Sequence, residues 1–328
     1  MDERRENVPK VEAEPYLPGY SEVLPYVHVS TYKDWQSVGE WYWNLIRDQF
    51  LLDASGKAEV ARITRGLKSE REKIIAIYNY VVQNTRYIGL EFGIHSHKPY
   101  PAYKVHARRY GDCKDKAGLM VAMLREVGVE ACMAVLRTKS RGRIEPHPAS
   151  LAVFNHVVCY VPKYEMWLDG TAEYSGTGEL PYEDQGTDTL LVGKGVREFV
   201  TTPVLGSERN LMSKTYEAAI LPDGGIEFEL TAEVIGQYAP SFRKRYQEEK
   251  DRENSLTKAW GTVLPNIVIS EIHFDNLKEL EKPVRYSFKA FAPDYVVADE
   301  GGGMGFTGLI QKLYLTRKYA SLSERKHG

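Results

Sequence analysis

The chain has 328 residues, 43% of them hydrophobic, and its 43 basic and 45 acidic residues give a net charge of −2 at pH 7. This balance gives no sign of a nucleic-acid partner or of an anionic membrane surface. The sequence contains no run of 18 or more apolar residues, so no membrane-spanning helix is expected. Three cysteines, Cys113, Cys132 and Cys159, are too few for a disulfide framework, and their spacing matches no zinc site.

The first 30 residues are rich in proline and have no periodicity, which predicts an extended arm. From Asp34 the apolar residues recur at spacings of three and four, so we expect a helix that ends near residue 46. A second helix is expected over 57–66. A third begins at Ser69, where S-E-R-E matches a capping box, and ends near residue 85. A short strand, RYIGLEF, follows it.

The stretch RRYGDCKDKAGLMVAMLREVG, residues 108–128, predicts a helix that begins at a cysteine. Asp112 is suited to the N-cap and Gly128 to the position just after the helix. Cys113 would then lie in the first turn, where free N–H groups and the positive end of the helix dipole favour a thiolate. The carboxylates of Asp112 and Asp115 oppose this effect. A nucleophilic cysteine at this place therefore needs a histidine partner.

A strand over 130–138, a polar loop and two further strands, FNHVVCYV and MWLDGTA, follow this helix. Helices followed by antiparallel strands predict an α+β fold. A symmetric turn centred between residues 162 and 163 would place Asp169 directly opposite His156, with Cβ atoms about 4.5–5.5 Å apart. A carboxylate at that distance can orient an imidazole, so Cys113, His156 and Asp169 form a candidate catalytic triad.

After residue 205 the pattern changes to strands. Asp223-Gly224-Gly225 predicts the turn of a hairpin. A charged helix is expected over 241–260, and strands near 267–274 and 284–292. We therefore expect three parts, which are an arm over 1–30, a catalytic domain over 31–204 and a β-rich accessory domain with one helix over 205–328.

The remaining motifs predict no cofactor and no metal. The HSH motif at 95–97 lacks a third ligand, so these histidines are interpreted as surface or cleft-lining residues. GGGMG at 301–305 lacks a strand-to-helix context and is interpreted as a flexible turn. Cys132 and Cys159 are interpreted as packing residues.

Three motifs in this order, G-D-C-K-D-K at 111–116, F-N-H at 154–156 and W-L-D-G-T-A-E at 167–173, resemble the transglutaminase-like superfamily. The resemblance is closer to bacterial multidomain proteins in which such a core is flanked by β domains of unassigned function, and it extends over about 24–328. It implies a papain-like fold in which Cys113 is the nucleophile, His156 the general base and acid, and Asp169 the orienting carboxylate.

Such relatives usually carry a further β domain before the helical region. The chain is therefore expected to be a trimmed form or a short member of this group. The compartment stays open, with a periplasmic or exported location as one alternative if the chain is a fragment of a longer secreted protein.

The expected reaction is acyl transfer through a thioester, with hydrolysis of a peptide or protein amide favoured. Transglutaminase-type amine transfer, deamidation, glycan-amide cleavage and acetyl transfer stay open, as does a non-enzymatic scaffold that binds a protein or peptide. The Cys113 N–H is expected in the oxyanion hole, with Tyr87 or Tyr110 as candidates for the second donor. An enzyme predicts the Cys113 sulfur within hydrogen-bond reach of His156 in a cleft, whereas a scaffold predicts a blocked or misaligned triad.

Overall fold

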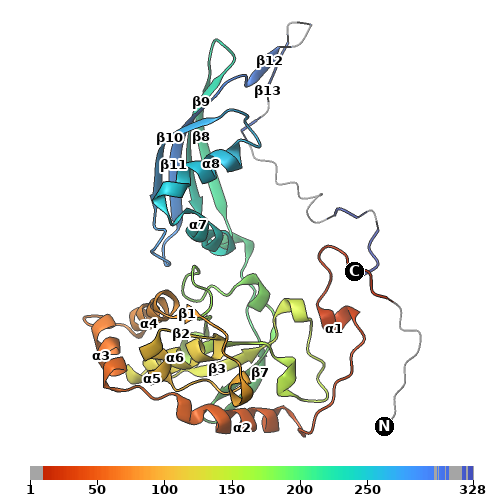
Figure 1. Cartoon of the computed structure of the whole chain (residues 1–328), viewed down its shortest axis with the longest axis vertical. Helices are drawn as coiled ribbons and strands as arrows, with labels where there is room; N and C mark the ends of the chain where they lie inside the picture. Colours follow the sequence, from red (N-terminus) through yellow and green to blue (C-terminus); the bar gives the residue numbers. More distant parts are fainter. Residues whose placement is uncertain are drawn as a thin grey trace.

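A computed structural model of the chain describes residues 10–298, 301, 303–306, 308–309, 320–322 and 324–327. Two antiparallel sheets organise it, one with strand order β5-β4-β3-β6-β7 and one with order β10-β11-β9-β8. Helices α2–α6 lie with the first sheet and α7 and α8 with the second, as Figure 1 shows. The predicted α+β class is confirmed. Among the described residues, no helix combines the length and apolarity needed to cross a bilayer.

The helical part consists of α2 (Trp35–Ile46), α3 (Ala54–Ile63), α4 (Glu70–Asn84), α5 (Ala102–Arg108) and α6 (Cys113–Glu126). Side-chain caps set four of the starts, and the predicted Ser69–Glu72 capping box is present. The prediction missed α5, which is only seven residues long and has no side-chain cap. Its end is set by Arg109 in the left-handed conformation (φ 60°).

The segment RYIGLEF forms a much shorter strand than predicted. Only β1 (Arg86–Tyr87) is extended and paired, and it runs parallel to β2 (Tyr110–Gly111). The chain after β1 therefore lies beside the residues that lead into α6, because the Ile88 N–H donates to the carbonyl of Gly111 at 3.0 Å.

Helix α6 is buried on all sides. One side contacts β4 and β3, and the others contact α3, α4 and α5. Every residue from Lys114 to Leu124 is buried, including three charged residues of its first turn. A helix this enclosed fixes the position of its own N-terminus, where Cys113 lies.

The first sheet contains β3 (Cys132–Leu136), β4 (His156–Val161), β5 (Met166–Leu168), β6 (Asp188–Gly193) and β7 (Val196–Thr201). Tyr160 pairs with Trp167, so the predicted register, with His156 opposite Asp169, is wrong by two residues. A 3₁₀ turn begins at Pro162, and Glu165 adopts a left-handed conformation (φ 47°), which moves the centre of the turn by one residue. Because the slip is even, both side chains stay on one face.

The second sheet contains β8 (Met212–Ile220), β9 (Ile226–Val234), β10 (Val268–Asp275) and β11 (Val284–Ala292). The predicted hairpin is confirmed, and Gly224 in its turn has φ +85°, a conformation that favours glycine.

The single helix predicted over 241–260 is wrong, because the chain forms α7 (Ala239–Tyr246) and α8 (Arg252–Trp260) instead. The side chain of Arg252 donates to the carbonyl of Tyr246 at 2.8 Å, so a side chain satisfies the end of α7 where a longer helix would use its own backbone. Tyr246 stacks on Phe274, while Trp260 packs on Phe228. Among its described residues, the accessory part therefore has two α-helices.

Part of GGGMG is a strand, since β13 (Met304–Phe306) pairs with β12 (Val296–Ala298). Residue 302 of this motif lies outside the described residues, as do residues 1–9 of the predicted arm. The described part of the arm is largely extended apart from one helical turn, α1 (Tyr20–Val23). It contacts the loop after β3, where Ser21 Oγ donates to the carbonyl of Arg143 at 2.9 Å. The domain limits at residues 30 and 204 stay predictions.

Arg243 of α7 joins the two parts of the chain. Its guanidinium donates to the carbonyl of Tyr174, which follows β5, at 2.8 Å, and to the carbonyl of Lys282, which precedes β11, at 2.7 Å. It also reaches the carbonyl of Leu280 at 3.1 Å. The side chain is only 2% exposed. A single buried cation thus bridges the chain after β5 and the β10–β11 connection.

We expect Arg243→Ala to lower the free energy of unfolding by about 2–4 kcal/mol, because it removes a buried donor shared by three main-chain carbonyls. Urea denaturation measures this loss. Arg245→Ala, on the exposed face of the same helix, is the control and should change the free energy by less than about 0.5 kcal/mol. Equal effects of the two substitutions would contradict the bridging role of Arg243.

Candidate active site

Cys113 is the first residue of α6, as predicted. Asp112 is the N-cap, and its side chain accepts the N–H of Asp115, in a reciprocal capping box. Gly111 leaves the space that this turn needs, since a Cβ there would lie 2.6 Å from the Cβ of Asp115. The thiol is partly exposed. The G-D-C sequence is thus explained by a tight turn that places a thiol at the N-terminus of a buried helix.

Both acids beside Cys113 have basic partners. Lys114 forms an ion pair with Asp112, and Arg108 with Asp115 at 2.6 Å. Burial raises the pKa of Asp115, and the nearby charge of Asp112 raises it further. The backbone N–H of Tyr100 and the positive charge of Arg108 lower it. The negative charge that the sequence places near the thiol is therefore largely compensated, as a thiolate requires.

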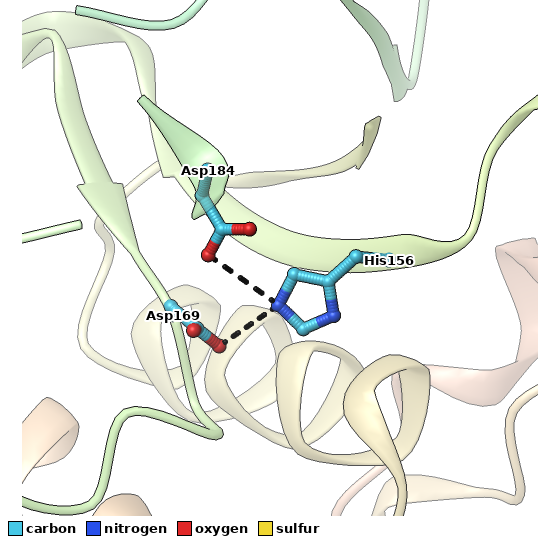
Figure 2. A group of neighbouring side chains, drawn as sticks. All are labelled: His156, Asp169 and Asp184. Atoms are coloured by element: carbon cyan, nitrogen blue, oxygen red, sulfur yellow. Dashed lines mark ion pairs between the residues drawn. The ribbon is translucent and has the colours of Figure 1, made fainter. Parts of the chain in front are cut away.

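His156, the first residue of β4, lies between the thiol and two carboxylates. Its Nε2 is 3.3 Å from Oδ1 of Asp169 and 3.8 Å from Oδ2 of Asp184, and Figure 2 shows both acids on the same side of the ring. Its side chain also lies close enough to Cys113 for the thiol to contribute to raising the pKa of the imidazole. Because Nε2 is directed at the carboxylates, Nδ1 is the ring nitrogen left for the thiol.

The charge balance of this group favours an imidazolium. Burial lowers the pKa of His156, but the charge and hydrogen bond of Asp169, with a further contribution from Cys113, raise it well above its ordinary value. Burial raises the pKa of Asp169, yet His156 and the donors of Thr171 bring it below its ordinary value. His156 and Asp169 thus stabilise each other's charged forms.

Asp169 lies just after the end of β5, diagonally across from His156. It is 3% exposed and accepts hydrogen bonds from the N–H and the hydroxyl of Thr171, both at 2.8 Å. The next residue, Gly170, packs against α6, where a Cβ would lie 2.7 Å from Met120 Cε and 2.9 Å from Lys116 Cβ. This close approach explains the D-G-T sequence, since a larger residue would push Asp169 away from the helix.

Asp184, in the 3₁₀ turn Tyr182–Asp184, was missed by the sequence analysis. It is 3% exposed, and its carboxyl group is hydrogen-bonded to Asp169. Burial and the nearby Asp169 raise its pKa to about 7, and His156 acts against the rise. No periodicity marks this residue, which is one of two adjacent acids in a polar connection.

A cleft of about 320 Å³ opens onto Cys113 and His156. Tyr42 and Phe154 contribute aromatic walls, and Glu91 and Arg141 are charged residues in the lining. The volume is at the lower end of the range for small-ligand pockets, so it suits a short segment of a larger molecule. The thiol and the imidazole are thus accessible to a substrate.

His156, Asp169 and Asp184 are also the group, among the described residues, whose histidine and carboxylate atoms all lie within 4.8 Å of one another, as a cation would require. A cation would need the Nε2 lone pair of His156. That lone pair is absent in the tautomer that donates to Asp169 and leaves Nδ1 to accept from the thiol. The trio therefore fits a hydrogen-bonded group better than a metal site.

The other predicted residues lie at different distances from the site. Burial raises the pKa of Tyr87 to about 12, and the nearby Cys113 contributes to this rise. The ring of Tyr110, in contrast, lies under Arg108. His97 lines the cleft, while His95 stacks on Tyr100. Of the two oxyanion candidates, Tyr87 is thus the one near the thiol.

At pH 7 we expect iodoacetamide to label Cys113 alone. Burial raises the pKa of Cys132 to about 12 and that of Cys159 well above its ordinary value, so both stay thiols. His156→Ala should slow labelling of Cys113 at least about tenfold, because the thiol loses its proton acceptor. Peptide mass spectrometry measures the three rates.

His97→Gln is the matched control for this measurement, because it changes a histidine in the same cleft outside the trio. Its labelling rate should equal that of the unmodified chain. Labelling of Cys113 that is indifferent to His156 would show that the pair is not assembled.

Comparisons with known proteins agree with this arrangement at the level of the family. Residues 57–169 match the model of the transglutaminase-like superfamily. This segment includes Cys113, His156 and Asp169. A comparison with curated proteins gave no match.

Two solved structures resemble the chain weakly. A "putative protease" from Parabacteroides distasonis shares 9% identity over 80% of this chain and 53% of its own, with a TM-score of 0.41. A "putative cysteine protease" from Cytophaga hutchinsonii shares 17% identity over 37% of this chain and 40% of its own, with a TM-score of 0.27. The chain thus spans about half of these proteins or less, and TM-scores this low do not establish a shared architecture. The family match thus makes residues 57–169 of the chain similar to the transglutaminase-like superfamily.

Proposed function

We propose that the chain is a thiol-dependent acyl-transfer enzyme that hydrolyses peptide amides. The observation that carries the proposal is the position of His156, which lines one cleft together with Cys113 and whose Nε2 lies 3.3 Å from Oδ1 of Asp169. A nucleophile, a base and an orienting acid in that order form the arrangement that covalent acyl transfer needs.

In this proposal His156 Nδ1 accepts the thiol proton and Cys113 Sγ attacks the carbonyl carbon of the amide. The tetrahedral oxyanion is stabilised by the N–H of Cys113 at the N-terminus of α6, with the Tyr87 hydroxyl as the candidate second donor. The imidazolium gives its proton to the leaving nitrogen, the C–N bond breaks and a thioester remains. Water, deprotonated by His156, then attacks the thioester and releases the acid and the thiol.

The open cleft and the grouping of Cys113, His156 and Asp169 favour an enzyme over a scaffold, since a binding protein has no need for a thiol, an imidazole and a buried carboxylate side by side. The acyl acceptor separates the chemical alternatives. Water gives hydrolysis or deamidation and an amine gives transamidation, so product analysis with and without an added primary amine distinguishes them.

We propose a peptide or protein as the substrate. Beside Glu91 in the cleft wall, the same loop presents Phe92 and Ile94, which are 77% and 54% exposed. Covering such exposed apolar side chains with a bound partner is favourable by about 25 cal/mol per Å² of apolar surface removed from water. An extended peptide crossing the cleft would cover them.

Cys113→Ala should lower amide hydrolysis of a peptide library by at least about 10³-fold and leave thermal stability nearly unchanged, because the thiol is the nucleophile and is only partly buried. Asp169→Asn should lower the rate by about 10²–10⁴-fold, because the amide does not hold the imidazolium. Product formation by mass spectrometry measures both. Unchanged rates would remove these residues from the chemistry, and unfolding of Cys113→Ala would give the thiol a structural role instead.

The double substitution Phe92→Ala and Ile94→Ala should lower kcat/KM for peptides about tenfold by removing apolar contacts. The rate of labelling of Cys113 by iodoacetamide should stay unchanged, because this small reagent does not depend on contacts with Phe92 and Ile94. Ile220→Ala, which alters an exposed residue of β8, is the control. A rim substitution that leaves kcat/KM unaltered would argue against peptide contact there.

A further inference from the structure

Asp184 is a buried acid in the candidate site that the proposed chemistry does not use. Its carboxyl group lies 3.8 Å from His156 Nε2 and within 4.8 Å of the Asp169 carboxylate, to which it donates a hydrogen bond when it is protonated. In Figure 2 it approaches the ring from the same side as Asp169 but from a different segment of the chain. The imidazole therefore faces two acids, where the triad requires one.

The main chain of Asp184 is held by the residues just before β6 and just after β7. Its carbonyl accepts hydrogen bonds from the hydroxyls of Thr202 at 2.5 Å and Thr187 at 3.2 Å. The next residue, Gln185, donates to the carbonyl of Leu180 at 2.7 Å. All these groups are buried. A surface acid would not need such support, so the position of this carboxyl group is built into the sheet.

Two hydrogen-bonded carboxyl groups share one proton, and the surroundings decide which group carries it. The pKa of Asp169 lies below its ordinary value because of His156 and Thr171, whereas burial and Asp169 raise that of Asp184 to about 7. Asp184 is therefore the proton donor and Asp169 the acceptor below about pH 7. The two carboxyl groups then carry one negative charge, and above that pH they carry two.

We propose that Asp184 is a second positioning carboxyl group of the site, which fixes Asp169 by a hydrogen bond and, once ionised, adds a negative charge that holds the proton on His156. This inference rests on the proposed Cys113–His156–Asp169 chemistry. Asp184 acts through these residues and does not itself touch the substrate.

Other charged groups face the trio from the surrounding elements. Glu183 acts on Asp184 from the same turn, and Cys113 acts on His156 from α6. Lys116, buried in α6, lies within electrostatic range of Asp169 and Glu173. Of the charged groups named here, Asp184 is the one that combines contact with both members of the His156–Asp169 pair and a change of charge near neutral pH.

The sign of the effect follows from the order of titration. The pKa of His156 lies well above its ordinary value and that of Asp184 is about 7, so an ionised Asp184 opposes the loss of the proton from His156. An opposite charge within about 4–6 Å shifts a pKa by about 1–3 units. Asp184→Asn can keep a hydrogen bond to Asp169 but cannot ionise, so His156 should lose its proton at a pH lower by at least about one unit.

The test measures the rate of Cys113 alkylation by iodoacetate between pH 4 and 10 in the full chain. This anion reacts with the thiolate faster while the imidazolium is charged, and iodide leaves as the S–C bond forms, so the alkaline fall of the rate reports His156. The variants are Asp184→Asn, Asp184→Ala and the control Glu183→Gln, which alters the exposed acid next to Asp184. Thermal unfolding is recorded for each.

The proposal expects the alkaline fall to move to lower pH by at least about one unit in Asp184→Asn, and to stay in place in Glu183→Gln. Because Asp184→Asn preserves shape and hydrogen bonding, it carries the test even if Asp184→Ala does not fold. An unmoved fall in a folded Asp184→Asn would overturn the proposal and leave the triad intact.

Two other results would also overturn it. In the first, the alkylation rate of the unmodified chain does not decrease at alkaline pH, or the decrease is still present in His156→Ala. The proposed triad and the role of Asp184 would then both be refuted. In the second, EDTA shifts the pH at which the alkylation rate of the unmodified chain decreases to the value seen in Asp184→Asn. A bound cation, and not a hydrogen bond, would then join the three residues.

Discussion

The enclosure of α6 between the five-stranded sheet and the helices α3–α5 is the packing on which the candidate site depends. A helix buried on every side cannot rotate or slide, so its first residue, Cys113, is fixed against β4. The charges of its first turn are buried with it, and each needs a partner. Lys114 pairs with Asp112 and Arg108 with Asp115. Core packing and thiol electrostatics are thus set by the same helix.

The site contains more acidic groups than the chemistry of a triad requires, and burial controls which of them are charged. Asp169 is kept ionised by donors and by the imidazole, whereas Asp184 lacks the donors of Thr171 and retains its proton to about pH 7. Two chemically identical side chains beside one imidazole thus differ in charge because their hydrogen bonds differ. Lys114, Arg108 and the backbone N–H of Tyr100 offset the negative charges of Asp112 and Asp115 near the thiol.

Local signals identified the parts of the site that local physics determines. The cap at Asp112, the start of α6 at Cys113 and the shared face of His156 and Asp169 could all be predicted, because they depend on neighbours in sequence or on strand alternation. The register was wrong by two residues, because a 3₁₀ turn with a left-handed Glu165 replaces the symmetric turn. Asp184 could not be found, since β6 and β7 bring it to the site and no pattern near it records that contact.

The bridge formed by Arg243 has a consequence for how the two parts of the chain could diverge. The segment between Asp169 and Ser175 is held from inside by the hydroxyl of Tyr78, which reaches the carbonyl of Ser175 at 3.2 Å, and from the accessory part by Arg243 at Tyr174. The backbone that carries the orienting acid therefore belongs to both parts. Exchange of the accessory part by recombination would remove the Arg243 contact at Tyr174 unless the new neighbour supplied an equivalent donor, so the two parts are expected to have been inherited together.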